Sequence, residues 1–273
     1  MKSSMAQSYV AFLNNPSIAD VQNIGKFVIG STGIPFFSDV VLFAANINGE
    51  DPEKSTLFYN NEMTDILEKN IESVRGLQNL GIKVQVSYLG NHQNAGWSAT
   101  MTKSACNSLA GKMVDDTIRF GLDGINIDDE YSLQSGNAQS FFWILQAIHS
   151  NSKFKGKKLT KALWSDQTYF SGETNVASLL TEGYEMTYAG GTSYLDKYVQ
   201  YGMIKSNLFL GLSPQYNLSS SVRNICESVI NNSYAGVMVW APNAFFSTVQ
   251  AEEYYSEILK AKDGDDANVI YKS

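Results

Sequence analysis

The sequence is poor in the residues that bind metals and carry charge. Only two cysteines and two histidines occur among its 273 residues. They form no cluster with carboxylates at metal-ligand spacing, so we do not expect a metal enzyme. No glycine-rich phosphate loop follows a strand-like run. Charged residues make up only 17%, and the net charge of −7 argues against nucleic acid as the main partner.

Long hydrophobic segments are also missing. No apolar run reaches the ~18 residues that a membrane-spanning helix needs, so no membrane span is expected. The first seven residues lack the apolar core of a signal peptide, which leaves the compartment open. Cys106 and Cys226 lie on apolar stripes of separate helix-like segments. We therefore expect free core thiols rather than a disulfide.

Short apolar runs alternate with helix-like patterns along the whole chain. The strand candidates are Tyr9–Leu13, Val40–Ile47, Val84–Leu89, Gly124–Asp128, Leu159–Trp164, Tyr184–Tyr188, Leu208–Leu212 and Val237–Trp240. Alternating strands and helices predict a parallel sheet with right-handed crossovers. Eight such units in a chain of this length predict a closed (β/α)8 TIM barrel. A doubly wound open sheet is the alternative.

Apolar residues spaced three and four apart mark the helix candidates. These are Met63–Leu77, Cys106–Phe120, Phe141–Ile148, Val222–Ile230 and Gln250–Leu259. The first connection, Gly25–Phe37, is rich in glycine and aromatic residues and is not expected to be helical. No Pro/Ser-rich linker divides the chain, so residues 1–273 are expected to form one α/β domain. Residues 1–7 and 264–273 are expected to be loosely ordered tails.

The segment Asp123–Glu130 (DGINIDDE) combines a buried strand with several polar groups. Side chains two apart on a strand share a face. Asn126, Asp128 and Glu130 therefore point one way, and the two isoleucines between Gly124 and Asp128 point the other. Buried carboxyl groups cost several kcal/mol unless they are paired, hydrogen-bonded or protonated. A carboxyl pair in which one group raises the pKa of the other is what glycosidic bond cleavage requires.

Polar and aromatic residues end many of the predicted strands. A barrel places its active site at the carboxyl ends of its strands. The residues found there are Asn14, Asn46, Asn91, His92, Asp128, Glu130, Ser165, Asp166, Tyr188, Gln215 and Trp240. Such a set suits a carbohydrate, because hydroxyls need hydrogen bonds and sugar faces need flat rings. Taken singly, Asn14, Ser165 and Asp166 are more often turn or cap residues.

DGINIDDE resembles the Asp-Gly-x-Asp-x-Asp-x-Glu signature on the fourth barrel strand of family 18 glycoside hydrolases. Asn126 stands where that family usually has an aspartate. The ending DDEYS, with Phe43–Asn48 and Gly81–Gln93, resembles the endoglycosidase H subgroup. Members of this subgroup are endo-β-N-acetylglucosaminidases that act on N-linked glycans. The resemblance is sharp from about residue 40 to residue 131.

The resemblance implies hydrolysis of the GlcNAc-β1,4-GlcNAc core bond of high-mannose or hybrid N-glycans, by substrate-assisted retaining catalysis. Glu130 would be the proton donor, and Asp128 would orient the acetamido group of the substrate. Met186-Thr187-Tyr188 resembles the family's sixth-strand Met-x-Tyr-Asp, with Ala189 in place of the aspartate. Tyr188 would then hold the acetamido carbonyl. No cofactor and no metal are needed.

The other site residues are assigned from their places on the strands. Trp240 would form the floor under the reacting sugar, with core packing as the alternative. Asn126 lies deepest in the barrel, and we expect its amide to bond Asp128 and to contribute to substrate binding. Asp129 is expected to point outward in a structural role. The remaining substrate-binding candidates are Asn46, Asn91, His92 and Gln215.

Two other functions stay open. A chitinase of the same family would perform the same chemistry on a GlcNAc polymer. A non-catalytic carbohydrate-binding barrel is the other, although such proteins typically lose the acid, and Glu130 is present. The expected partner is an N-glycan on a glycoprotein or glycopeptide. By resemblance we expect a monomer that works outside the cell, in the periplasm or at the cell surface.

Overall fold

Eight parallel strands close into a barrel in the computed structural model, which describes residues 7–245 and 247–273. The strands are β1 (Ser8–Asn14), β3 (Asp39–Asn48), β5 (Lys83–Gly90), β6 (Gly124–Ile127), β7 (Lys158–Leu163), β8 (Glu182–Glu185), β9 (Leu208–Leu212) and β10 (Gly236–Trp240). The first strand pairs with both β3 and β10, which closes the barrel. The predicted (β/α)8 barrel is confirmed, and the open sheet is wrong.

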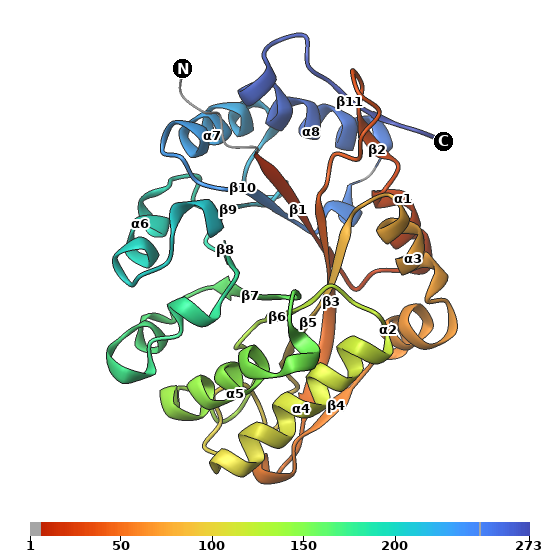
Figure 1. Ribbon diagram of the computed structural model, residues 1–273. Coiled ribbons are helices and arrows are strands. Elements are labelled where there is room, and N and C mark those ends of the chain that lie inside the picture. The colour runs from red at the N-terminus through yellow and green to blue at the C-terminus, as the bar shows by residue number, and fades with distance from the viewer. Residues whose placement is uncertain (1–6, 246) are drawn as a thin grey trace.

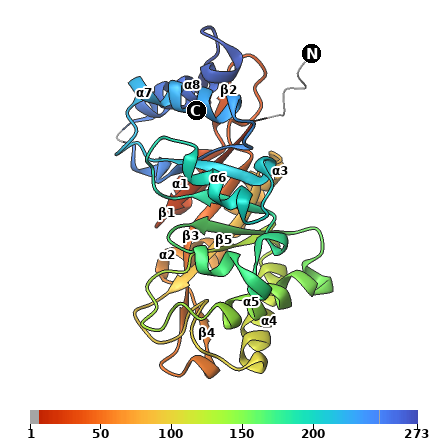
Figure 2. The same cartoon turned by 90° about the vertical axis from the view of Figure 1, so that its left-hand side faces the viewer.

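Helices surround the strands, as Figures 1 and 2 show. They are α1 (Ile18–Ile24), α2 (Asn61–Thr64), α3 (Glu72–Asn79), α4 (Lys103–Arg119), α5 (Ala138–Ser150), α6 (Ser193–Gln200), α7 (Ser219–Asn231) and α8 (Thr248–Asp263). Local signals begin several of them. Thr102 caps α4 by accepting a hydrogen bond from Ala105, and Asn137 caps α5 in the same way through Ser140.

The single helix predicted over Met63–Leu77 is broken into pieces. A π-helical turn, Asp65–Lys69, follows α2, and Asn70 then leaves helical geometry with φ −136° and ψ 44° before α3 begins. The Asn70 side chain donates to the Asp65 carbonyl across this break. The apolar spacing correctly predicts burial, since Met63 and Leu77 are both buried. Spacing alone does not reveal an interruption of the helix.

The last residues of the chain are fixed to the barrel. The strand β11 (Val269–Tyr271) pairs antiparallel with β2 (Phe27–Ile29), beside α8 (Figures 1 and 2). The backbone N–H of Val269 donates to Ser256 on α8 at 2.9 Å. The expectation of a loosely ordered tail over 264–273 is therefore wrong for Val269–Tyr271. Residues 1–6 of the other expected tail lie outside the described residues.

Side-chain alternation along the strands separates two apolar regions. A small cluster fills the barrel interior and contains Val10, Phe12, Val41, Tyr184, Phe209 and Met238. A larger cluster fills the layer between strands and helices, and it includes both cysteines. Cys106 and Cys226 are free and buried, as predicted. No helix of the described residues is long and apolar enough to cross a membrane.

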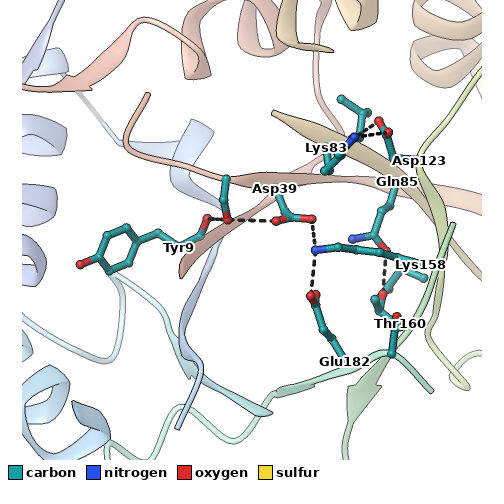
Figure 3. Close-up of polar contacts among 12 residues, drawn as sticks. Tyr9, Asp39, Lys83, Gln85, Asp123, Lys158, Thr160 and Glu182 are labelled. Carbon is teal, nitrogen blue, oxygen red and sulfur yellow. Dashed lines mark hydrogen bonds and ion pairs between the residues drawn. The ribbon is translucent and has the colours of Figure 1, made fainter. Parts of the chain in front are cut away.

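An ion-pair network closes the amino-terminal end of the barrel (Figure 3). Lys158, at the start of β7, donates to Asp39 at 2.6 Å and contacts Glu182 at 2.8 Å. Burial alone would lower the pKa of Lys158, but the two carboxylates raise it overall. The network lies at the start of its strands, opposite the end where a barrel carries its active site.

Candidate active site

A cavity of about 500 Å³ lies at the carboxyl ends of β6 and β7. The residues that matter for its chemistry are Asp128, Glu130, Lys161, Trp164, Asp166 and Tyr169. Asp128 follows β6 directly and is only 5% exposed, whereas Glu130 is half-buried. The geometry therefore brings the two predicted catalytic carboxyl groups to one cavity at the expected end of the barrel.

Burial controls the charge state of this pair. It raises the pKa of Asp128 to about 7, with a further rise from the charge of Glu130 and an opposing effect of Lys161. Burial also raises the pKa of Glu130, where Lys161 again opposes and Asp129 adds to the rise. Because the two groups interact, their protons belong to the pair. At mildly acidic to neutral pH the pair holds a proton that a leaving group can accept.

Asn126 does not make the hydrogen bond predicted for it. Its carbonyl oxygen accepts from the Ser87 hydroxyl at 2.8 Å, and its amide nitrogen donates to Thr160 at 2.9 Å. Ser87 and Thr160 are its direct register partners on β5 and β7. These cross-strand neighbours lie at the same level, whereas Asp128 lies two residues further along. Asn126 is fully buried and supports the site from below instead of presenting its amide to a ligand.

Asp129 has the structural role expected of it. The Ser98 hydroxyl lies 2.7 Å and 2.9 Å from its two carboxylate oxygens, and the Tyr169 hydroxyl donates to it at 2.6 Å. In the described part of the chain, hydrogen bonds hold this carboxylate, and no salt bridge does.

Tyr188 follows β8 by three residues and lies within the electrostatic influence of the carboxyl pair. Burial raises the pKa of its hydroxyl, and the charges of Glu185, Asp128 and Glu130 raise it further. Its ring stacks on Tyr216 at a centroid distance of 6.1 Å. Among residues 7–245 and 247–273, the hydroxyl has one side-chain partner, the Met186 sulfur, at a distance of 3.6 Å. A better acceptor on a ligand can replace such a weak partner.

A second cavity of about 520 Å³ lies over the ends of β1, β9 and β10. Asn14, Gln215 and Trp240 line it, and the Trp240 ring packs edge-on against Phe43 at 4.9 Å. Of the predicted site residues, Gln215 and Trp240 thus line this second cavity, whereas Asp128 and Glu130 line the first.

Besides Asn126 and Tyr188, three predicted substrate-binding residues line neither cavity. The Asn46 amide donates to the Gly90 carbonyl at 2.9 Å, and the Asn91 amide donates to Asn48 at 2.9 Å. The His92 ring packs against Tyr131 at a centroid distance of 5.3 Å. Their polar groups mainly join the ends of β3, β5 and β6, as turn residues do.

Sequence reasoning missed Lys161. This side chain is 1% exposed, and its ammonium donates to the Ala162 carbonyl at 2.8 Å and to Asp166. The sequence feature that could have identified it is the presence of a lysine inside the apolar run Leu159–Trp164. Trp164, the end of that run, is 50% exposed at the cavity. Within residues 7–245 and 247–273, no group of three His, Cys, Asp or Glu side chains is placed to hold a metal ion.

The chain is a (β/α)8 barrel with a carboxyl pair directly after its fourth barrel strand. No protein-family model matches the chain. It is 34% identical over 145 residues to an endo-β-N-acetylglucosaminidase of Flavobacterium sp. (strain SK1022). The match covers 51% of this chain and 45% of that protein. The chain thus spans about half the length of this relative. The resemblance to endo-β-N-acetylglucosaminidases drawn from the motifs is confirmed.

Solved structures share the whole fold. EndoBT-3987 of Bacteroides thetaiotaomicron, solved with a Man5GlcNAc product, superposes with a TM-score of 0.73 at 20% identity. The superposition covers 99% of this chain and 63% of that chain. EndoBT-3987 has also been solved with a Man9GlcNAc2Asn substrate. A chitinase from the same organism has a TM-score of 0.67 at 17% identity, covering 95% of this chain and 97% of that one.

Proposed function

We propose that the protein hydrolyses the GlcNAc-β1,4-GlcNAc core bond of N-linked glycans. The observation that carries this proposal is the pair formed by buried Asp128 and half-buried Glu130 beside a cavity at the carboxyl end of the barrel. The similarity to an endo-β-N-acetylglucosaminidase adds the substrate class. High-mannose chains fit best, because the structural neighbour EndoBT-3987 has been solved with a Man9GlcNAc2Asn substrate.

The proposed mechanism is the one that the family resemblance implies for these two carboxyl groups. Glu130 protonates the leaving glycosidic oxygen. The acetamido oxygen of the substrate attacks the anomeric carbon, and the bond to the leaving sugar breaks to give an oxazolinium. Asp128 accepts the acetamido N–H and offsets its growing positive charge. Water then opens the ring while Glu130 takes its proton, which restores the starting state of the protein.

Tyr188 and Trp240 complete the proposed site. The Tyr188 hydroxyl lies in the field of Asp128 and Glu130 and has a weak sulfur partner, so it is suited to hold the acetamido carbonyl. Trp240 exposes part of its ring to the second cavity, where a flat apolar surface suits the face of a sugar. Gln215, exposed at the same cavity, would bind hydroxyls of the glycan.

Chitin cleavage is the second candidate, because a chitinase barrel covers nearly the whole chain. The two functions are separated by offering a high-mannose glycoprotein and chitooligosaccharides in parallel, with Glu130→Gln as the blank. Glycan release that exceeds chitooligosaccharide cleavage supports the endo-β-N-acetylglucosaminidase. The reverse order assigns the protein to chitin instead. The proposal includes a monomeric enzyme acting outside the cytoplasm, which rests on the family resemblance.

A further inference from the structure

Lys161 is a buried cation in a place where an apolar residue would fit. It occupies the outward-facing position of β7 between Leu159 and Leu163, both of which belong to the apolar layer under the helices. Its ammonium lies 5.8 Å from the centroid of the Phe141 ring and 6.0 Å from that of Tyr169. A buried ion pair is often no more stabilising than an apolar replacement. Stability alone therefore does not explain the lysine.

The ammonium is held firmly in one position. It donates to the Ala162 carbonyl and to Asp166, and Asp166 also accepts a hydrogen bond from the Tyr198 hydroxyl on α6 at 2.5 Å. Both members of the ion pair are nearly inaccessible to water. Asp166 supplies the opposite charge that a buried ammonium needs.

Lys161 lines the same cavity as the carboxyl pair. It is the one Lys or Arg among the cavity-lining residues, all of which belong to the described part of the chain. The titratable groups around it are Asp128, Asp129 and Glu130 after β6, Asp166 and Tyr169 after β7, and Tyr198 on α6 through Asp166. Tyr188, after β8, also interacts electrostatically with the carboxyl pair. Charge is weakly screened in such a site, so one fixed cation acts on both carboxyl groups.

We propose that Lys161 is a positioning residue that fixes the charge of the Asp128–Glu130 pair, keeping one carboxyl ionised while the other stays protonated. The inference rests on the proposed function of that pair. Without the cation, burial would favour two neutral carboxyl groups, and the group that must offset the developing oxazolinium charge would be lost. In agreement, Lys161 opposes the rise in pKa of both Asp128 and Glu130. It acts through the carboxyl groups and not on the sugar.

The test is a carboxyl titration by ¹³C NMR on labelled protein, which needs no activity. The double variant K161M/D166N replaces the ion pair with neutral side chains and leaves Tyr198 an acceptor. We expect the pKa values of Asp128 and Glu130 to rise by on the order of 0.5–1 unit. This shift is at or below the low end of the usual effect of a nearby opposite charge, because the negative charge of Asp166 offsets part of the effect of Lys161. The basic limb of kcat against pH should move up equally.

The matched control is K158M/D39N. It removes the ion pair between Lys158, on the same strand as Lys161, and Asp39 of β3, at the opposite end of the barrel (Figure 3), and should leave the titration unchanged. K161R keeps the cation and should retain wild-type values. Unchanged pKa values in K161M/D166N, or equal shifts in the K158M/D39N control, would overturn the inference.

A single variant covers the case in which K161M/D166N fails to fold. K161M removes the cation and leaves Asp166 its hydrogen bond from Tyr198, so the pKa of Asp128 should rise, and a fall or no change would count against the inference. The titration also separates the two proposals. A wild-type protein that releases no glycan refutes the proposed function, whereas the titration reports on Lys161 alone.

Discussion

The Tyr169 hydroxyl donates a 2.6 Å hydrogen bond to Asp129, the residue between the two carboxyl groups of the candidate active site. Tyr169 lies after β7 and stacks on Phe141 of α5 at 4.3 Å. The bond therefore ties the segment that follows β6 to the neighbouring strand and to the helix layer. Because Asp129 is anchored in this way, the neighbouring Asp128 and Glu130 keep the side-chain orientation that is set by the alternation along the strand.

Tyr169→Phe should lower activity without unfolding the protein. The phenylalanine keeps the stack on Phe141 but leaves Asp129 with Ser98 as its partner. We expect a loss of about 1 kcal/mol in the free energy of unfolding. Because small displacements of catalytic groups are costly, kcat should fall between a few-fold and ~10²-fold. Urea unfolding and steady-state kinetics measure the two effects.

The control for that change is Tyr201→Phe, which removes a hydroxyl that has no hydrogen-bond partner among the described residues. It should keep wild-type kcat. A Tyr169→Phe enzyme with unchanged kcat would show that the hydrogen bond from Tyr169 to Asp129 is not needed for activity.

Glu130→Gln should abolish hydrolysis while the glycan still binds. The amide preserves the shape of the side chain but cannot donate the proton, and general acid catalysis contributes ~10²–10⁴-fold. Turnover and calorimetric binding are measured together, with exposed Glu173→Gln as the matched control. More than about a tenth of wild-type turnover would be incompatible with Glu130 as the acid, since general acid catalysis contributes at least ~10²-fold.

Asp128→Asn should reduce kcat far more than it changes KM. An amide can still accept the acetamido N–H, but it cannot offset the charge that forms in the transition state. Steady-state kinetics on a glycopeptide measure this separation. If KM rose and kcat held, Asp128 would be a binding group only.

The same variant should alter the pH dependence of stability. Burial raises the pKa of Asp128 from its ordinary 3.8 to about 7. Between these values the folded protein binds the proton more tightly, so wild-type stability is lost as pH rises through about 7. Asp128→Asn removes this loss, so relative to wild type it should gain on the order of a few kcal/mol between pH 4 and pH 8. Denaturant unfolding of both proteins at both pH values measures the difference. If their free energies of unfolding changed equally with pH, the raised pKa of Asp128 would be contradicted.

The strands of the barrel could be predicted from the sequence because buried strands leave a simple signal. Each of the eight apolar runs became a barrel strand, with bounds shifted by three residues or fewer. The alternation in Asp123–Glu130 also placed Asp128 and Glu130 correctly at one cavity. A local sequence pattern is enough to predict a feature that depends on a single strand.

Features that depend on neighbouring segments could not be read in this way. Asn126 bonds Ser87 and Thr160 because of strand register, which no single strand encodes. The tail pairs with β2 across more than two hundred residues of sequence. Lys161 gains its role from Asp166 and from the carboxyl groups of another strand.

The cut site itself is measured by incubating the protein with a high-mannose glycoprotein and weighing both products. Cleavage of the core bond predicts a protein that retains one GlcNAc on each glycosylated asparagine, and a free glycan that ends in a single GlcNAc. A product without any GlcNAc, with asparagine converted to aspartate, would contradict the proposed function. An unchanged glycoprotein alongside degraded chitooligosaccharides would contradict it equally.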